Sequence, residues 1–207
     1  MKKFLRLFLS CFFLLFSWPF FLYKKYGNTG YKLTNRTIII SNHYSNFDPF
    51  FIYLIYGRNK KIHFVTIAET KKKLWSRFVT WLFDCLYVDT STNNIVFFKE
   101  CIRILNNDGI ICIFPEGFVN HRKYGFLDFQ ASYVFLARKT QTTILPLYIY
   151  PRGQLFKKSL IYIGKPFETK DYSHIADHEM ASMHIQSHVM DYSTIIDKVL
   201  EEEKNKR

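Results

Sequence analysis

His43 and Asp48 have the residue types and the spacing of a general base and the acid that orients it. They lie in the stretch SNHYSNFDPF, residues 41–50, separated by four residues. A carboxylate that accepts a hydrogen bond from one imidazole nitrogen fixes the tautomer, which leaves the other nitrogen able to take a proton from a substrate hydroxyl. An alternative is purely local. Ser45 and Asp48 would form a capping box, or Asp48 would cap a helix that begins at Pro49.

This pair would need a nucleophile from the substrate. The sequence contains no Gly-x-Ser-x-Gly elbow and no glycine-rich phosphate loop, which are the usual signals of a serine nucleophile and of a nucleotide site. General-base assistance by a histidine supplies about 10²- to 10⁴-fold in rate. The base could activate a substrate hydroxyl, which gives group transfer, or water, which gives hydrolysis of a thioester or lipid.

The pair lies where a strand passes into a helix. Residues 36–42 have the pattern of a short buried strand, and residues 49–57 that of a helix closed by glycine. Further strands are predicted at residues 61–68, 87–89, 110–114, 143–150 and 160–167, the third of which runs into a Pro-Glu-Gly loop at 115–117. Further helices are predicted at residues 69–86, 95–109, 124–140 and 175–203. Strands that alternate with helices predict an α/β fold, with a mixed, partly parallel sheet flanked by helices and the reacting groups at strand ends.

The composition favours a membrane-associated protein over one that binds nucleic acid. The chain has 207 residues, which fits one domain, and its 29 Lys+Arg against 17 Asp+Glu give a net charge of +12. That charge attracts anions such as phospholipid headgroups, nucleic acids or phosphorylated substrates. Aromatic residues make up 19% of the chain, and they gather in long apolar runs instead of alternating with basic residues. We therefore predict no nucleic-acid partner.

The four cysteines have no paired spacing of the kind that marks a zinc site, whereas the i,i+4 spacing of the C-terminal histidines could ligate a metal on a helix. The cysteines are Cys11, Cys85, Cys101 and Cys112. The histidines, which include two i,i+4 pairs, are His174, His178, His184 and His188. The stretch HEMAS, residues 178–182, has a serine where a zinc-protease helix needs its second histidine. We therefore predict solvated histidines and no metal site.

The first 30 residues are predicted to be a membrane-anchoring segment. Residues 7–23 are a largely apolar run of 17 residues, and the basic residues on its two sides are Lys2, Lys3, Arg6, Lys24 and Lys25. As a helix the run would be about 25 Å long, short of the roughly 30 Å hydrocarbon core, and Pro19 interrupts it. The basic flanks favour an apolar anchoring helix on the cytosolic face of a membrane. This helix would be either a monotopic anchor or a single N-terminal anchor. The alternative is an unusually apolar core helix of a soluble domain.

Several stretches together resemble the glycerolipid acyltransferases, specifically the 1-acylglycerol-3-phosphate O-acyltransferases. Residues 42–48, NHYSNFD, are similar to the signature of that family, an Asn-His pair followed by four residues and an aspartate. Residues 113–117, IFPEG, are similar to its Phe-Pro-Glu-Gly block, and residues 144–149, ILPLYI, resemble the block that follows. YIGKPF, residues 162–167, resembles the strand before the terminal helix. The order and spacing of these stretches make the resemblance specific, and it covers most of the chain.

This resemblance implies transfer of an acyl chain from acyl-CoA or acyl carrier protein to the hydroxyl of a lysophospholipid in a membrane. With 1-acylglycerol-3-phosphate as the acceptor, the product would be phosphatidic acid, a step of phospholipid biosynthesis. His43 would be the base and Asp48 its orienting acid, while Glu116 and Gly117 would belong to the acceptor-binding loop. Glu116 has a structural alternative, since a buried carboxylate needs partners. Residues 31–207 would form the acyltransferase domain, with the acyl thioester as co-substrate and no cofactor.

Two positions depart from the pattern of relatives that bind a glycerophosphate. Those relatives carry arginines where this chain has Thr90 and Val119. An arginine binds phosphate through a two-pronged fork, so each loss removes a contact of about 1.5–3 kcal/mol. Arg122 and Lys123 are predicted to bind the substrate instead. The alternatives are that both are solvated surface charges, that the acceptor is a different lysolipid, or that the protein is a noncatalytic lipid-binding relative.

Overall fold

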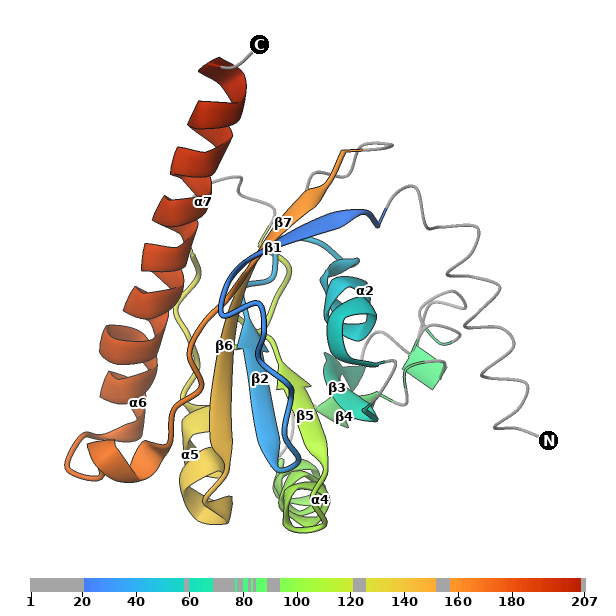
Figure 1. Cartoon of the computed structure of the whole chain (residues 1–207). Coiled ribbons are helices and arrows are strands. Elements are labelled where there is room, and N and C mark those ends of the chain that lie inside the picture. The colour runs from blue at the N-terminus through green and yellow to red at the C-terminus, as the bar shows by residue number, and fades with distance from the viewer. Residues whose placement is uncertain are drawn as a thin grey trace.

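The architecture is a seven-stranded sheet with helices on both faces. The structure is a computed structural model that describes residues 21–57, 60–68, 77, 80, 81, 83, 85–88, 94–120, 126–151 and 157–205. Within these residues the strand order is β1-β7-β6-β2-β5-β3-β4 (Figure 1). All neighbouring strands run parallel except β6 and β7, which are antiparallel. The predicted α/β fold with a mixed, partly parallel sheet is therefore confirmed.

The strands are short, and the central ones are buried on both faces. Their bounds are β1 Tyr23–Gly27, β2 Thr37–Ser41, β3 Ile62–Ile67, β4 Leu86–Val88, β5 Ile110–Ile113, β6 Thr143–Tyr150 and β7 Ser159–Ile163. All five residues of β2 are buried, as are all four of β5. Continuous runs of β-branched residues are typical of parallel strands that are covered on both sides. This explains why β2 and β5 have no polar face.

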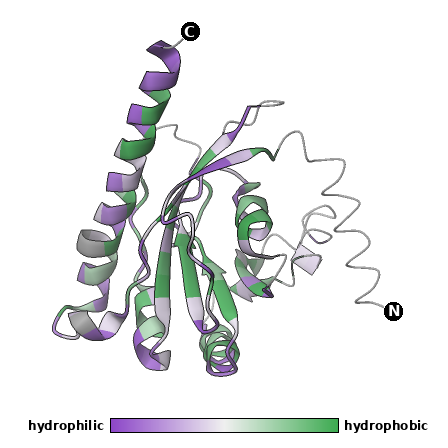
Figure 2. Cartoon of the chain, viewed as in Figure 1, coloured by the Kyte–Doolittle hydropathy of each residue, from purple (hydrophilic) through white to green (hydrophobic). Residues whose placement is uncertain are grey.

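The helices form two layers. Their bounds are α2 Asp48–Ile52, its π-helical continuation η2 Tyr53–Gly57, α4 Ile95–Asn106, α5 Ser132–Thr140, the 3₁₀ turn η4 Thr169–Tyr172, α6 Asp177–Glu179, the π-helical η5 Met180–Gln186 and α7 Ser187–Asn205. Ile38 and Ile40 pack in a core cluster with residues of α4, α5 and α7, whereas Ile39 points to a second cluster with α2. Successive side chains of a strand face opposite sides of the sheet, so β2 contributes to both cores. Figure 2 shows the apolar central strands between the helices and the mixture of polar and apolar residues along α7.

The predicted anchoring segment, residues 1–30, lies largely outside the described residues. Within it, Tyr23–Gly27 form β1, which pairs with β7 at one edge of the sheet; the sequence did not predict this strand. None of the helices in the described ranges has the length and apolar character needed to cross a membrane. The boundary between an anchor and a domain beginning at residue 31 stays a prediction.

The helix predicted at residues 124–140 is shorter than expected. It begins at Ser132, and residues 126–130 have no regular secondary structure. Their backbone N–H groups are used elsewhere: Leu127 donates to the Glu116 carboxylate at 3.0 Å and Gln130 to the carbonyl of Pro115 at 2.9 Å. A helix would compete for these donors. The amphipathic helices predicted at residues 69–86 lie mostly outside the described residues.

Candidate active site

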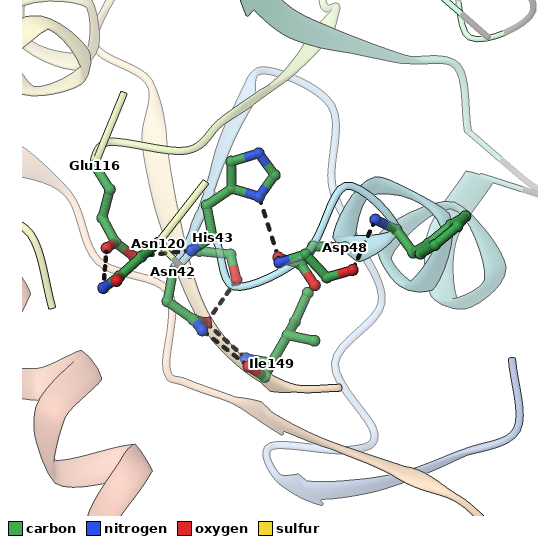
Figure 3. A network of polar contacts seen from close by, with 9 residues as sticks. Asn42, His43, Asp48, Glu116, Asn120 and Ile149 are labelled. Atoms are coloured by element: carbon green, nitrogen blue, oxygen red, sulfur yellow. Dashed lines mark hydrogen bonds and ion pairs between the residues drawn. The ribbon is translucent and has the colours of Figure 1, made fainter. Parts of the chain in front are cut away.

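The predicted catalytic residues lie at the carboxyl ends of two neighbouring central strands. β2 ends at Ser41 and leads into Asn42 and His43, while β5 ends at Ile113 and leads into the loop 114–120. β2 and β5 are adjacent and parallel, so their carboxyl ends meet at the same edge of the sheet. That edge is where open α/β sheets bind their ligands. Figure 3 shows the polar network that forms there.

His43 and Asp48 form the expected pair. The Nδ1 atom of His43 lies 3.1 Å from Oδ2 of Asp48, and the side chains are 16% and 0% exposed, respectively. Burial raises the pKa of Asp48, while the hydrogen bonds and charge of His43 and the backbone N–H of Ser45 lower it. With Nδ1–H donating to the carboxylate, the other ring nitrogen of His43 is the one able to accept a proton. The pair thus has the geometry of a base and its orienting acid.

The capping box of Ser45 and Asp48, the local alternative to a catalytic pair, is partly present in the same geometry. The backbone N–H of Ser45 donates to Oδ2 of Asp48 at 2.9 Å, which is the half of a capping box in which the acid reaches back. The N-cap residue of α2 is Phe47, which makes no side-chain cap hydrogen bond, and Pro49 lies in the first turn. One carboxylate oxygen therefore accepts from both Ser45 and His43. Capping and orientation of the imidazole coexist, and the local alternative does not exclude the catalytic interpretation.

The loop after β5 contacts both the ring and the backbone of His43. The ring of Phe114 stacks on the imidazole, with the centroids 4.2 Å apart and the planes at 21°. The backbone N–H of His43 donates to Oε1 of Glu116 at 2.8 Å. The backbone N–H of Asn120 donates to the carbonyl of His43 at 2.6 Å. The loop therefore determines where the imidazole lies.

Glu116 is buried and has protein partners on both carboxylate oxygens. Its exposed fraction is 3%, and its Oε2 atom accepts from Asn120 Nδ2 at 3.1 Å and from the N–H of Leu127 at 3.0 Å. Burial raises the pKa of Glu116, and the hydrogen bonds from Leu127, His43 and Asn120 lower it. The sequence predicted a substrate-binding residue with a structural alternative. These contacts favour the structural alternative.

Asn42 is a site residue whose role the sequence analysis did not anticipate. It is fully buried, and its side-chain amide donates to the carbonyl of Ile149 at 2.8 Å and accepts from the N–H of Ile149 at 2.7 Å. The amide thus continues the β2–β6 pairing beyond Ser41 (Figure 3). A buried asparagine at the end of an apolar strand was the available signal, because a buried amide needs hydrogen-bond partners.

His43 opens into a cavity with largely apolar walls. The cavity has a volume of about 480 Å³ and is lined by β3, β4, the start of α4 and the loop after β5, a size typical of sites for small ligands. Phe97, Phe98 and Phe118 contribute aromatic walls. Among its described lining residues there is no lysine or arginine. A second cavity, of about 750 Å³, lies between β7 and α7 and contains neither His43 nor Asp48.

The other predicted substrate-binding residues have different placements. Gly117 lines the cavity with a φ of 77°, and a Cβ there would lie 2.7 Å from Nε2 of Gln130, so this position requires glycine. Val119 also lines the cavity. Arg122 and Lys123, which were predicted to bind the substrate, and Thr90 lie outside the described residues. No group of three or more His, Cys, Asp or Glu residues in the described ranges is placed to hold a metal.

Comparisons with known proteins agree with the fold and the motifs. A family model described as Acyltransferase matches residues 24–150. Among solved structures, the chain is similar to the crystal structure of the 1-acyl-sn-glycerophosphate (LPA) acyltransferase PlsC from Thermotoga maritima, with 22% sequence identity and a TM-score of 0.63. The match covers 86% of this chain and 75% of that one. At this identity the likeness shows a shared fold. A comparison with curated protein sequences found no match.

Proposed function

The chain belongs to the acyltransferase family, and from this premise we propose that it transfers an acyl chain from a thioester to the free hydroxyl of a lysophospholipid. The observation that carries the proposal is the His43–Asp48 pair, in which His43 lines a cavity with largely apolar walls. A lipid substrate fits such walls, since burying its chain there removes apolar surface from water. The donor would be acyl-CoA or acyl carrier protein.

The residues suggest a mechanism without a covalent enzyme intermediate. His43 takes the proton of the acceptor hydroxyl as that oxygen attacks the thioester carbonyl carbon. The tetrahedral intermediate then collapses, the C–S bond breaks, and the imidazolium returns the proton to the leaving thiolate. Asp48 holds the ring through Nδ1–H and stabilises the imidazolium that forms. The thioester supplies the activated acyl group, so the proposed reaction uses no metal and no cofactor.

The first candidate acceptor is 1-acylglycerol-3-phosphate, which would give phosphatidic acid. A second candidate, a lysolipid without a phosphomonoester, is favoured by the side chain at position 119. Val119 lines the cavity where glycerophosphate-binding relatives carry an arginine, and the described lining residues include no lysine or arginine. A phosphomonoester prefers charge-assisted donors. Both acceptors would be embedded in a membrane, and the proposed location is its cytosolic face, with the part of residues 1–30 that precedes β1 as the anchor.

Product analysis with a panel of acceptors tests the proposed function. The purified protein, in lipid vesicles, would be given a labelled acyl thioester with lysophosphatidate, lysophosphatidylcholine or monoacylglycerol. We expect the label in a diacyl lipid only when an acceptor is present. Release of free fatty acid at the same rate without an acceptor would indicate hydrolysis. Acceptor binding without turnover, with both CoA and carrier-protein donors, would support a noncatalytic lipid-binding protein.

Replacing Val119 with arginine is expected to shift acceptor preference toward a phosphate headgroup. A new charge-assisted contact of about 1.5–3 kcal/mol corresponds to a KM for lysophosphatidate about 10- to 100-fold lower. The KM for monoacylglycerol should stay the same or rise. Val119→Gln is the control for added length without charge. Equal changes of KM for the charged and the neutral acceptor would contradict the predicted place of the headgroup.

A further inference from the structure

The backbone of His43 lies beyond the end of its strand, and the loop after β5 supplies its hydrogen-bond partners. The ladder of β2 with β5 ends at Ile40, and its ladder with β6 ends at Ser41. A backbone N–H or C=O group left unpaired away from water would be costly. Glu116 accepts from the N–H of His43, and the N–H of Asn120 donates to its carbonyl. One loop therefore holds both polar groups of the residue that carries the imidazole.

We propose that Glu116 and Asn120 are positioning residues that clamp the backbone of His43 and thereby place its imidazole for proton transfer. Figure 3 shows the two side chains beside the His43 backbone, on the side away from Asp48. The Asn120 amide donates to the Glu116 carboxylate at 3.1 Å, which joins the two halves of the clamp. The inference rests on the proposed function, because it assumes that His43 is the base.

The placement of Glu116 argues against a direct role in binding the acceptor. Both of its oxygens accept hydrogen bonds from protein donors, and its side chain is 3% exposed. Its neighbours Pro115 and Gly117 line the cavity, whereas Glu116 is not among the lining residues that the structure describes. A carboxylate in this position acts on the substrate only through the residues that it holds.

Asn120 is the part of the clamp that the sequence motifs do not indicate. It lies four residues after Glu116, is 4% exposed, and uses its backbone N–H for His43 and its side chain for Glu116. Phe114, at the start of the same loop, stacks on the His43 ring. A shift of this loop would therefore move the ring and the backbone of His43 together. Proton transfer is sensitive to such shifts, because a misplacement of about 1 Å can lower a rate by about 10²-fold.

The kinetic test compares Glu116→Gln and Asn120→Ala with the wild-type protein in the transfer assay. Glutamine has only one acceptor oxygen. Its NH₂ group would face N–H donors that now donate to an oxygen of Glu116, and the hydrogen bonds on that side would be lost. We expect kcat to fall about 10- to 100-fold in Glu116→Gln and about tenfold in Asn120→Ala, with the KM of donor and acceptor unchanged. The matched controls are Glu100→Gln and Asn107→Ala, outside the site on and just after α4; both should keep the wild-type kcat.

A second readout does not depend on activity. In protein labelled with ¹⁵N-histidine, the amide of His43 is one of only seven histidine amides. Hydrogen exchange at that amide should be about tenfold faster in Glu116→Gln, because the carboxylate that protects it is gone. If Glu116→Gln does not fold, Asn120→Ala provides both readouts, since loss of its side chain loosens the same carboxylate.

The outcomes separate the clamp from the proposed function. A higher KM for the acceptor with an unchanged kcat would assign Glu116 to substrate binding and overturn the clamp. Unchanged exchange at the His43 amide in both variants would also overturn it. An absence of acyl transfer by the wild-type protein would instead overturn the proposed function. Full transfer activity in His43→Ala would overturn the assignment of His43 as the base, and with it the catalytic purpose of the clamp. Loss of activity in His43→Ala, together with normal kcat in the two clamp variants, would leave the function standing and remove the clamp alone.

Discussion

Replacing His43 with alanine is expected to lower kcat for acyl transfer by about 10²- to 10⁴-fold. The reason is that the acceptor hydroxyl is a poor nucleophile until its proton is removed. Among the described residues that line the cavity, only His43 has a titratable side chain that could remove it. The KM of both substrates should change little, because the imidazole acts on the proton and the apolar walls bind the chains. The measurement is the initial rate of diacyl lipid formation with saturating donor and acceptor.

The control for this variant is an exposed histidine. His174 is exposed near the 3₁₀ turn η4, so His174→Ala should keep the wild-type rate. The free energy of unfolding of both variants should be measured in urea, so that loss of folded protein is not mistaken for loss of chemistry. A folded His43→Ala protein with an undiminished rate would contradict the assignment of the base.

Replacing Asp48 with asparagine is expected to lower kcat by about 10²- to 10⁴-fold, because it removes the negative charge beside His43 or changes the tautomer of the ring. The carboxylate accepts at Oδ2 from both the imidazole and the N–H of Ser45. Because one oxygen accepts from both donors, an asparagine has two possible placements. With its amide oxygen at that place, it keeps both hydrogen bonds but lacks the negative charge that stabilises the imidazolium. With its NH₂ group there, Nδ1 of His43 becomes the acceptor, and the ring proton moves to the nitrogen that must take the substrate proton.

The free energy of unfolding shows whether the loss of kcat in Asp48→Asn comes from the chemistry or from loss of folded protein. Burial raises the pKa of Asp48, so its contribution to stability is fully present below the unfolded pKa and is lost as the pH rises through the folded pKa. At pH 7 the neutral asparagine avoids the desolvation cost, and we expect little loss of stability in urea. As the pH is lowered toward about 4, the free energy of unfolding of the wild-type protein should rise relative to that of the variant. The exposed Asp191→Asn is the control, and normal activity of Asp48→Asn would contradict the orienting role.

Much of the sheet could be predicted because its strands have recognisable local sequence patterns. The apolar run that forms β2 is fully buried, and the predicted strand at residues 36–42 differs from Thr37–Ser41 by one residue at each end. The predicted strand-to-helix junction exists and holds His43 and Asp48 together. The family that the motifs indicated is confirmed. These features depend on residues that are close in sequence or on motifs in a fixed order.

The missed features depend on partners that are distant in sequence. β1 pairs with β7, whose residues lie more than 130 positions further along the chain, and no local pattern announces that pairing. The start of α5 is delayed because Leu127 and Gln130 donate to the loop after β5. Of the partners of Glu116, His43 lies 73 positions earlier in the chain and Leu127 lies 11 positions later, whereas Asn120 belongs to the same loop. A motif shows that such a residue matters, and only the fold shows what it touches.

Chemical rescue tests the central claim, that His43 is the base of the acyl transfer, most directly. His43→Gly leaves a space beside Phe114 and Asp48 where the imidazole was, and free imidazole can enter it from the cavity. The rate of acyl transfer by this variant would be measured with and without imidazole. The account predicts an inactive variant whose rate rises about tenfold or more with imidazole, while the wild-type rate does not change. A His43→Gly protein that transfers acyl chains at the wild-type rate without imidazole would contradict it.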